Sequence, residues 1–143
     1  MPSANHPIKS TIKAGSVYYF NDPELKTTYS HYCIVVNIEP SKDTVIFLVY
    51  SSHKISKVRE RRKGFPTETL VEIDPNRYPE FSAKSIIDCN IVLERSMEMI
   101  ASKFDQGKLE IKPIMGLRLV RILRKGIMAS NQIDERIKVL LTE

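Results

Sequence analysis

One polar side chain lies at the start of an apolar segment of this sequence, and two more lie just after the end of the next apolar segment. Their types suit proton transfer at a phosphodiester. His31 opens the segment 31–38, and Ser51 and Ser52 follow the segment 45–50. A histidine can take up and release a proton near neutral pH, and a hydroxyl can hold a phosphate oxygen. If the two segments pair, these side chains lie close together. They are the candidate catalytic residues for a reaction in which the 2′-hydroxyl of RNA attacks the adjacent phosphorus.

Each candidate also has a structural interpretation that the sequence leaves open. His31 can be a histidine at the rim of a sheet with a satisfied hydrogen bond, and Ser51 and Ser52 can be polar strand ends. We interpret His53 as a solvent-exposed residue. Asp88 lies within an apolar strand, where structural pairing with a base is favoured over catalysis.

A strongly basic run follows the second apolar segment. Its cations are candidates for binding the phosphate backbone of RNA. The alternatives are a solvated loop or a contact surface for an acidic protein partner. The whole chain has a net charge of +5, which fits a polyanionic partner. The candidate RNA-binding residues are Arg59, Arg61, Arg62 and Lys63.

The two apolar segments carry the strongest secondary-structure signal. Both are rich in β-branched and aromatic residues, and the connector 39–44 is polar and turn-like, so they predict a central β-hairpin. We interpret 51–64 as a long surface loop with at most one helical turn. Further strands are expected at 16–20, 69–73, 84–94 and 109–111.

Helical signals follow the strands. The segment 96–104 predicts a short helix. Apolar residues recur at helical spacing after Pro113, with Gly126 as the expected stop. A second C-terminal helix is expected with Ser130 or Asn131 as its N-cap.

The order of elements predicts the fold class. The 143 residues, 42% of them hydrophobic, suit one domain, 1–143. Short strands followed by helices indicate a mainly β protein with C-terminal helices (α+β), built on a small curled antiparallel sheet or open barrel. We expect a flexible N-terminal arm over 1–13, the barrel over 14–111 and a helical tail over 112–143.

Several common functional classes lack their motifs here. The chain has no GxxxxGKS phosphate loop, no GxGxxG and no GxSxG elbow. The two cysteines lie apart in apolar runs, so neither a metal site nor a cofactor is expected. The first residues are polar and no apolar run nears the roughly 20 residues that span a bilayer, so we expect a cytoplasmic protein without a membrane partner.

Four segments follow one another in an order that resembles a known family. They are residues 15–19 (Gly-Ser-Val-Tyr-Tyr), 31–36 (His-Tyr-Cys-Ile-Val-Val), 45–52 (Val-Ile-Phe-Leu-Val-Tyr-Ser-Ser) and 85–90 (Ser-Ile-Ile-Asp-Cys-Asn). In spacing and hydrophobic pattern they resemble the strands of the PemK/MazF toxins, over about residues 15–109. The resemblance implies a PemK-like, SH3-like barrel that forms a homodimer.

The same resemblance implies a function. Typical members are toxins of type II toxin–antitoxin pairs, endoribonucleases that cut single-stranded RNA without a metal and are blocked by an antitoxin protein. Their catalytic pair is an arginine near the start of the second long strand and a hydroxyl residue after the third. Ser51 or Ser52 matches the hydroxyl, whereas Ser30 and His31 stand where the family has Arg-Pro.

The leading hypothesis is therefore a metal-independent endoribonuclease toxin. Two alternatives stay open. One is a non-catalytic member of the same fold that binds nucleic acid or protein. The other is a gyrase-type poison in which a C-terminal helix faces the partner protein.

Overall fold

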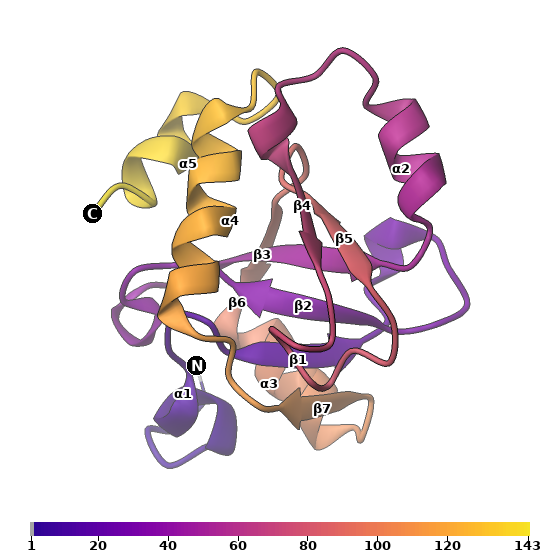
Figure 1. Cartoon of the computed structure of the whole chain (residues 1–143). Helices are drawn as coiled ribbons and strands as arrows, with labels where there is room; N and C mark the ends of the chain where they lie inside the picture. Colours follow the sequence, from indigo (N-terminus) through magenta and orange to yellow (C-terminus); the bar gives the residue numbers. More distant parts are fainter. Residues whose placement is uncertain (1) are drawn as a thin grey trace.

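The computed structural model describes residues 2–143 and shows one antiparallel sheet with helices on both of its faces (Figure 1). Six of the seven strands run in the order β4-β5-β3-β2-β1-β7, and the seventh, β6, pairs with β3. The strands are β1 (Val17–Phe20), β2 (His31–Val35), β3 (Val45–Ser52), β4 (Leu70–Ile73), β5 (Ser85–Asp88), β6 (Leu93–Ser96) and β7 (Leu109–Lys112).

The helices fall before, between and after the strands. Three short 3-10 turns cover Pro23–Leu25, Pro40–Lys42 and Thr67–Thr69. The α-helices are α1 (Pro7–Thr11), α2 (Ile55–Arg61), α3 (Met97–Asp105), α4 (Leu117–Ala129) and α5 (Glu135–Leu140). The predicted α+β class with a small curled antiparallel sheet is confirmed. The sheet formed by the described residues stays open rather than closing into a barrel, with β4 and β7 at its two edges.

The predicted central hairpin is confirmed as β2 and β3, which pair with Cys33 opposite Tyr50 and Val35 opposite Leu48. The first strand ends at Val35 rather than at residue 38. Beyond it the Asn37 side chain takes over the pairing, because its Oδ1 accepts from the Phe47 amide at 2.7 Å.

The expected single strand over 84–94 is wrong, because the chain turns after Asp88. The Asp88 carboxylate accepts hydrogen bonds from both the backbone and side-chain nitrogens of Asn90, at 3.0 and 2.9 Å. This turn separates β5 from β6, and both then pair with the same edge of β3. Strand β6 pairs with the first half of β3, and β5 pairs with Ser51 and Ser52.

The central strands are buried on both faces, which explains their nearly continuous apolar sequence. Alternate side chains point to opposite faces of a strand. Val17 and Ile34 therefore pack against α4 on one face, while Tyr18 and Cys33 face α1 and α3 on the other.

The N-terminal segment is not the loose arm expected over 1–13. Residues 7–11 form α1, which packs against α3, and the Ile8 side chain is fully buried. Burying an aliphatic side chain of this size contributes about 1.5–3 kcal/mol, enough to hold a short helix in place. Met1, the first residue of the predicted arm, lies outside the described residues.

The C-terminal helices are confirmed, but their ends differ from those expected. Residues 113–116 are extended because the Tyr78 hydroxyl donates to the Pro113 carbonyl at 2.6 Å, and the Met115 amide donates to the Gly15 carbonyl at 2.8 Å. Helix α4 therefore begins at Leu117 and runs through Gly126.

Gly126 is a packing residue of α4 rather than its stop. A Cβ at this position would lie 2.8 Å from the Cys89 sulfur and 2.7 Å from the Glu68 carbonyl oxygen. The N-cap of α5 is Asp134, not Ser130 or Asn131. Within residues 2–143, no helix combines the length and the apolar character needed to cross a membrane.

Candidate functional site

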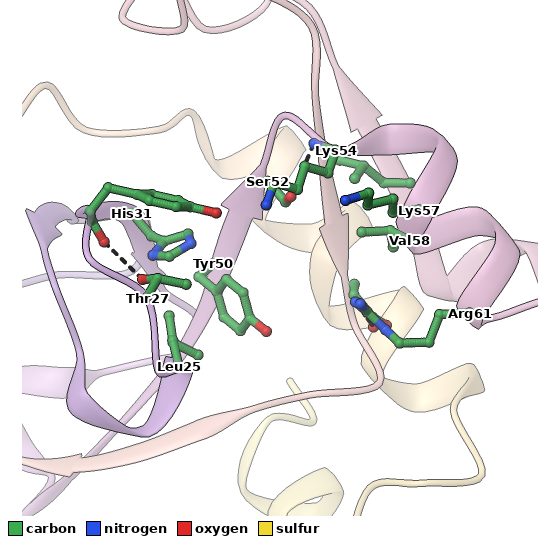
Figure 2. A pocket seen from close by; sticks show the side chains of 12 residues that line it. Leu25, Thr27, His31, Tyr50, Ser52, Lys54, Lys57, Val58 and Arg61 are labelled. Carbon is green, nitrogen blue, oxygen red and sulfur yellow. Dashed lines mark hydrogen bonds and ion pairs between the residues drawn. The ribbon is translucent and has the colours of Figure 1, made fainter.

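The start of β2 and the end of β3 meet at one end of the sheet, because the two strands are antiparallel. Continuing the pairing of Cys33 with Tyr50 places His31 opposite Ser52. Both residues line a cleft of about 260 Å³ that opens between the hairpin and α2 (Figure 2). The predicted meeting of these two polar ends is therefore present in the structure.

Helix α2 forms the opposite wall of the cleft, where sequence reasoning expected a loop with at most one turn. The seven-residue helix is anchored by Val58, which is 4% exposed. The residue after it, Arg62, donates from Nε to the Asp88 carboxylate at 2.7 Å. An apolar contact and a partly buried ion pair thus fix the helix beside the strand ends.

His31 lies at the base of the cleft, with only 7% of its surface exposed. Its ring sits 5.0 Å from the Tyr29 ring and 5.4 Å from the Tyr50 ring, centroid to centroid. Its Nδ1 atom is buried and has no hydrogen-bond partner among residues 2–143. The alternative of a rim histidine with a satisfied hydrogen bond is therefore wrong for this nitrogen.

The surroundings of His31 favour its neutral form. Burial lowers the pKa of the imidazole below its ordinary value, and the nearby positive charges of His53 and Lys54 lower it further. A neutral imidazole can accept a proton near neutral pH from a substrate hydroxyl that reaches its ring.

Three cationic side chains stand across the cleft from His31, on or just before α2. Figure 2 shows Lys57 and Arg61 on the α2 side of the cleft, facing the wall formed by His31 and Tyr50. Neither Lys54 nor Lys57 has a carboxylate within 4 Å among the described residues, and Arg61 lies 3.8 Å from Asp88. These cations are placed to bind an anion such as a phosphate.

The structure separates the four predicted RNA-binding residues. Arg61 alone among them lines the cleft. Arg59 forms an ion pair with Glu72 on β4, at 2.8 Å from its Nε, and Arg62 pairs with Asp88. Lys63 is exposed, outside the cleft. The structural interpretation of Asp88 is confirmed, since this 5% exposed carboxylate pairs with an arginine.

The two predicted serines have different surroundings. Ser51 is buried and pairs with β5 opposite Ile87. Ser52 is partly exposed, and its Oγ accepts a hydrogen bond from the Lys54 amide at 3.1 Å, so it also serves as a polar strand end. Of the two, Ser52 reaches the cleft that contains the cations.

Two cations of the site, Lys54 and Lys57, were missed in the sequence. Together with the predicted Arg61 they have the i, i+3, i+7 spacing of one helix face, and Ile55 and Val58 have apolar helical spacing. This pattern could have revealed α2. His53 is exposed, as interpreted, and its Nδ1 lies 3.2 Å from the Ser85 hydroxyl.

No group of three or more histidine, cysteine, aspartate or glutamate side chains suited to a metal ion occurs within residues 2–143. In comparisons with known proteins, no family model matches this chain and no curated protein is significantly similar to it.

Proposed function

We propose that this protein is an endoribonuclease that cleaves single-stranded RNA in the cleft between His31 and α2, as the toxin of a toxin–antitoxin pair. One observation carries the proposal. A buried histidine that is biased toward its neutral form lines the same cleft as Lys54 and Lys57, which have no carboxylate within 4 Å among the described residues, and as Arg61, which lies 3.8 Å from Asp88. This combination suits a general base beside a bound phosphate.

The reaction needs only the substrate and groups of the cleft. His31 removes the proton from a 2′-hydroxyl, and the 2′-oxygen forms a bond to the adjacent phosphorus. Arg61 and Lys57 offset the negative charge that grows on the phosphorane oxygens, and the Ser52 hydroxyl donates to one of them. The bond from phosphorus to the 5′-oxygen then breaks, that oxygen takes up a proton from water, and His31 releases its own proton to water. The products carry a 2′,3′-cyclic phosphate and a 5′-hydroxyl.

The toxin part of the proposal draws on the resemblance of residues 15–109 to the PemK/MazF pattern and on the charge of the site. An acidic antitoxin segment would pair with Lys54, Lys57 and Arg61 and exclude RNA from the cleft. In this scheme His31 stands where the family has an arginine. It acts as a proton carrier, whereas an arginine would supply a fixed positive charge.

One observation favours a second candidate, a protein that binds RNA at this cleft without cutting it. His31 is only 7% exposed, so a substrate hydroxyl must enter deeply to reach its ring. In that case the cations and tyrosines of the cleft supply affinity, and His31 is part of the cleft floor.

The deciding experiment incubates the purified protein with diverse single-stranded RNAs in the presence of EDTA. We expect cleavage that leaves 2′,3′-cyclic phosphate ends and that stops when a 2′-deoxy nucleotide occupies the cut position. The variants H31A and S52A are compared with R118A, which changes an exposed residue of α4.

Each result decides between the candidates. RNAs that stay intact while still binding to the protein support the second candidate. H31A and S52A proteins as active as the wild type would overturn the assignment of the site. Induced expression followed by RNA sequencing tests the toxin part, because cleaved cellular RNA is expected with the wild type and not with H31A.

A further inference from the structure

Two further hollows continue the cleft along the same end of the sheet. The first, here the tyrosine hollow, shares Tyr29, His31 and Ser52 with the cleft. The second, here the lysine hollow, shares Tyr19 and Ser30 with the tyrosine hollow. Neighbouring hollows thus share lining residues, so the three adjoin in a row at the strand ends, here called the path.

The order of the strands gives this path its direction. Strands β3, β2, β1 and β7 are neighbours in the sheet, and the path crosses their ends from Ser52 through His31 and Tyr19 to Glu110. Neighbouring strands lie about 4.8 Å apart, so this crossing alone spans roughly 14 Å. The α2 wall lengthens the path on the β3 side.

Aromatic faces occupy the middle of the path. The rings of Tyr19 and Tyr32 lie 4.6 Å apart, tilted by 47°. Tyr29 is 47% exposed, and the Lys54 ammonium lies 5.7 Å from its ring centre. The Lys112 ammonium lies 5.5 Å from the centre of the Tyr19 ring, so Tyr29 is the most open of these rings. Aromatic side chains at a surface can stack with unpaired bases of any sequence.

Cations occupy the far end of the path. The Lys108 amide donates to the Lys103 carbonyl at 2.9 Å, through a turn in which Gly107 has a φ of 71°. This turn places both lysines on the lysine hollow, and neither has a carboxylate within 4 Å among the described residues. The hollow's own acid, Glu110, lies 3.7 Å from the Lys112 ammonium, which offsets its charge.

The geometry points to an extended binding path for single-stranded RNA, from the cleft across the tyrosine hollow to Lys103 and Lys108. This inference rests on the proposed function, because it assumes that the cleft holds a scissile phosphate. The strand occupies about four nucleotides, the lower end of the range for small single-strand-binding folds. Its phosphates contact the cations at both ends, and its bases stack on the tyrosines between them.

The test uses 2′-O-methyl RNA oligonucleotides of two to eight nucleotides, which bind but cannot be cleaved because the attacking hydroxyl is blocked. Fluorescence anisotropy gives the affinity of the wild-type protein at each length and salt concentration. Affinity is expected to rise up to about four nucleotides and then to level off.

The variant K103A/K108A removes the far cations. We expect the six-nucleotide probe to bind about tenfold more weakly. The slope of log affinity against log salt concentration, here the salt slope, should be smaller by about 1.4, the value for two phosphate contacts. Its affinity for the two-nucleotide probe should not change. Y19A should weaken the longer probe about tenfold, the cost of one lost stacking contact. The control R118A/K125A removes two cations from α4 and should bind every probe as the wild type does.

The outcomes separate this inference from the proposed function. If K103A/K108A binds the six-nucleotide probe as the wild type does, while R61A binds it weakly, the path ends at the cleft and this inference is overturned. If K103A/K108A and the α4 control lose affinity equally for all probes, general charge explains the binding and the inference fails as well. If the wild type binds no probe of any length, the proposed function fails together with it.

Discussion

The two ends of the β2–β3 hairpin differ in whether their polar groups have hydrogen-bond or charge partners. At the end where β2 leaves the sheet, the buried side chains of Asn37 and Arg124 are bonded to the backbone or to a counter-charge. At the end where β2 begins, a buried ring nitrogen and two lysines have no such partner among the described residues. The first arrangement holds the fold together, and the second leaves groups free for a ligand.

The tied end depends on Arg124 of α4 and on Asn37. The buried Arg124 guanidinium donates to the carbonyls of Val36 and Asn37 at 2.7 and 3.0 Å, and to the Glu143 carboxylate at 2.9 Å. The side-chain Nδ2 of Asn37 donates to the Val45 carbonyl at 2.9 Å. These bonds join α4 to the hairpin.

The contrast between the two ends indicates where to look for function. Buried polar groups in stable proteins are almost always hydrogen-bonded, since an unmet one costs about 1–3 kcal/mol. The free Nδ1 of His31 is such an exception, and it lies where the charges of Lys54 and Lys57 are also unmet. If the contrast holds, changes at the free end should affect activity, and changes at the tied end should affect stability.

The largest effect is expected from H31N at the free end. The rate of RNA cleavage should fall by about 10²–10⁴, the usual contribution of a general base. The free energy of unfolding should change by roughly 1 kcal/mol or less, because no protein group loses a hydrogen bond to Nδ1. Single-turnover cleavage and urea unfolding measure the two quantities. A large loss of stability would show that His31 belongs to the fold rather than to a site.

The opposite pattern is expected from R124M at the tied end. This change leaves the buried carbonyls of Val36 and Asn37 without a donor, and should lower the free energy of unfolding by about 3 kcal/mol. Cleavage by the protein that remains folded should match the wild type. The control R121M removes another partner of Glu143 from the exposed face of α4, and little change in stability is expected. Equal losses from both variants would remove the distinction between the two ends.

A smaller effect is expected from K57A, which removes one free cation from the cleft. Affinity for single-stranded RNA should fall about fivefold, and the salt slope should shrink by about 0.7, the value for one phosphate contact. The matched control is K42A, since Lys42 is also exposed but pairs with Glu39 at 2.8 Å. Binding that falls equally in both variants would mean that only net charge matters.

The smallest effect is a shift in pH dependence. Because burial and nearby positive charge lower the pKa of His31, cleavage by the wild type should decline only as pH falls below 6.5. K54A removes one of those charges, so the imidazolium becomes less unfavourable and the pKa of His31 rises. The acid limb of the pH–rate profile should therefore move to higher pH. A shift in the other direction would mean that His31 does not act as the base.

The hairpin and the meeting of its polar ends could be predicted because the signals are local. Residues 31–35 and 45–50 have strong strand propensity, and the antiparallel pairing follows from the short connector between them. Once the pairing is given, His31 must lie near Ser52. The boundary at Val35 was missed, because it depends on a side-chain hydrogen bond between Asn37 and the Phe47 amide.

The remaining site features depend on contacts between distant residues. Helix α2 is mostly polar and charged, and it is held by Val58 packing and by the Arg62–Asp88 pair, which spans 26 positions. The turn after Asp88 has a local signal, an aspartate two residues before an asparagine, which sequence reasoning did not use. The lack of a hydrogen-bond partner for the Nδ1 of His31 could not be predicted, because it depends on which residues from distant parts of the sequence surround the ring.

Strand β3 has a consequence for the order in which the chain folds. It pairs with β2 on one side and with β5 and β6 on the other, and the last of these partners ends at Ser96. During synthesis at about 5–20 residues per second, its second edge therefore stays open for seconds after Ser52 emerges. An open edge beside buried aliphatic residues readily pairs with another chain. Nascent chains that stall between β3 and β6 are thus the form of this protein most exposed to aggregation.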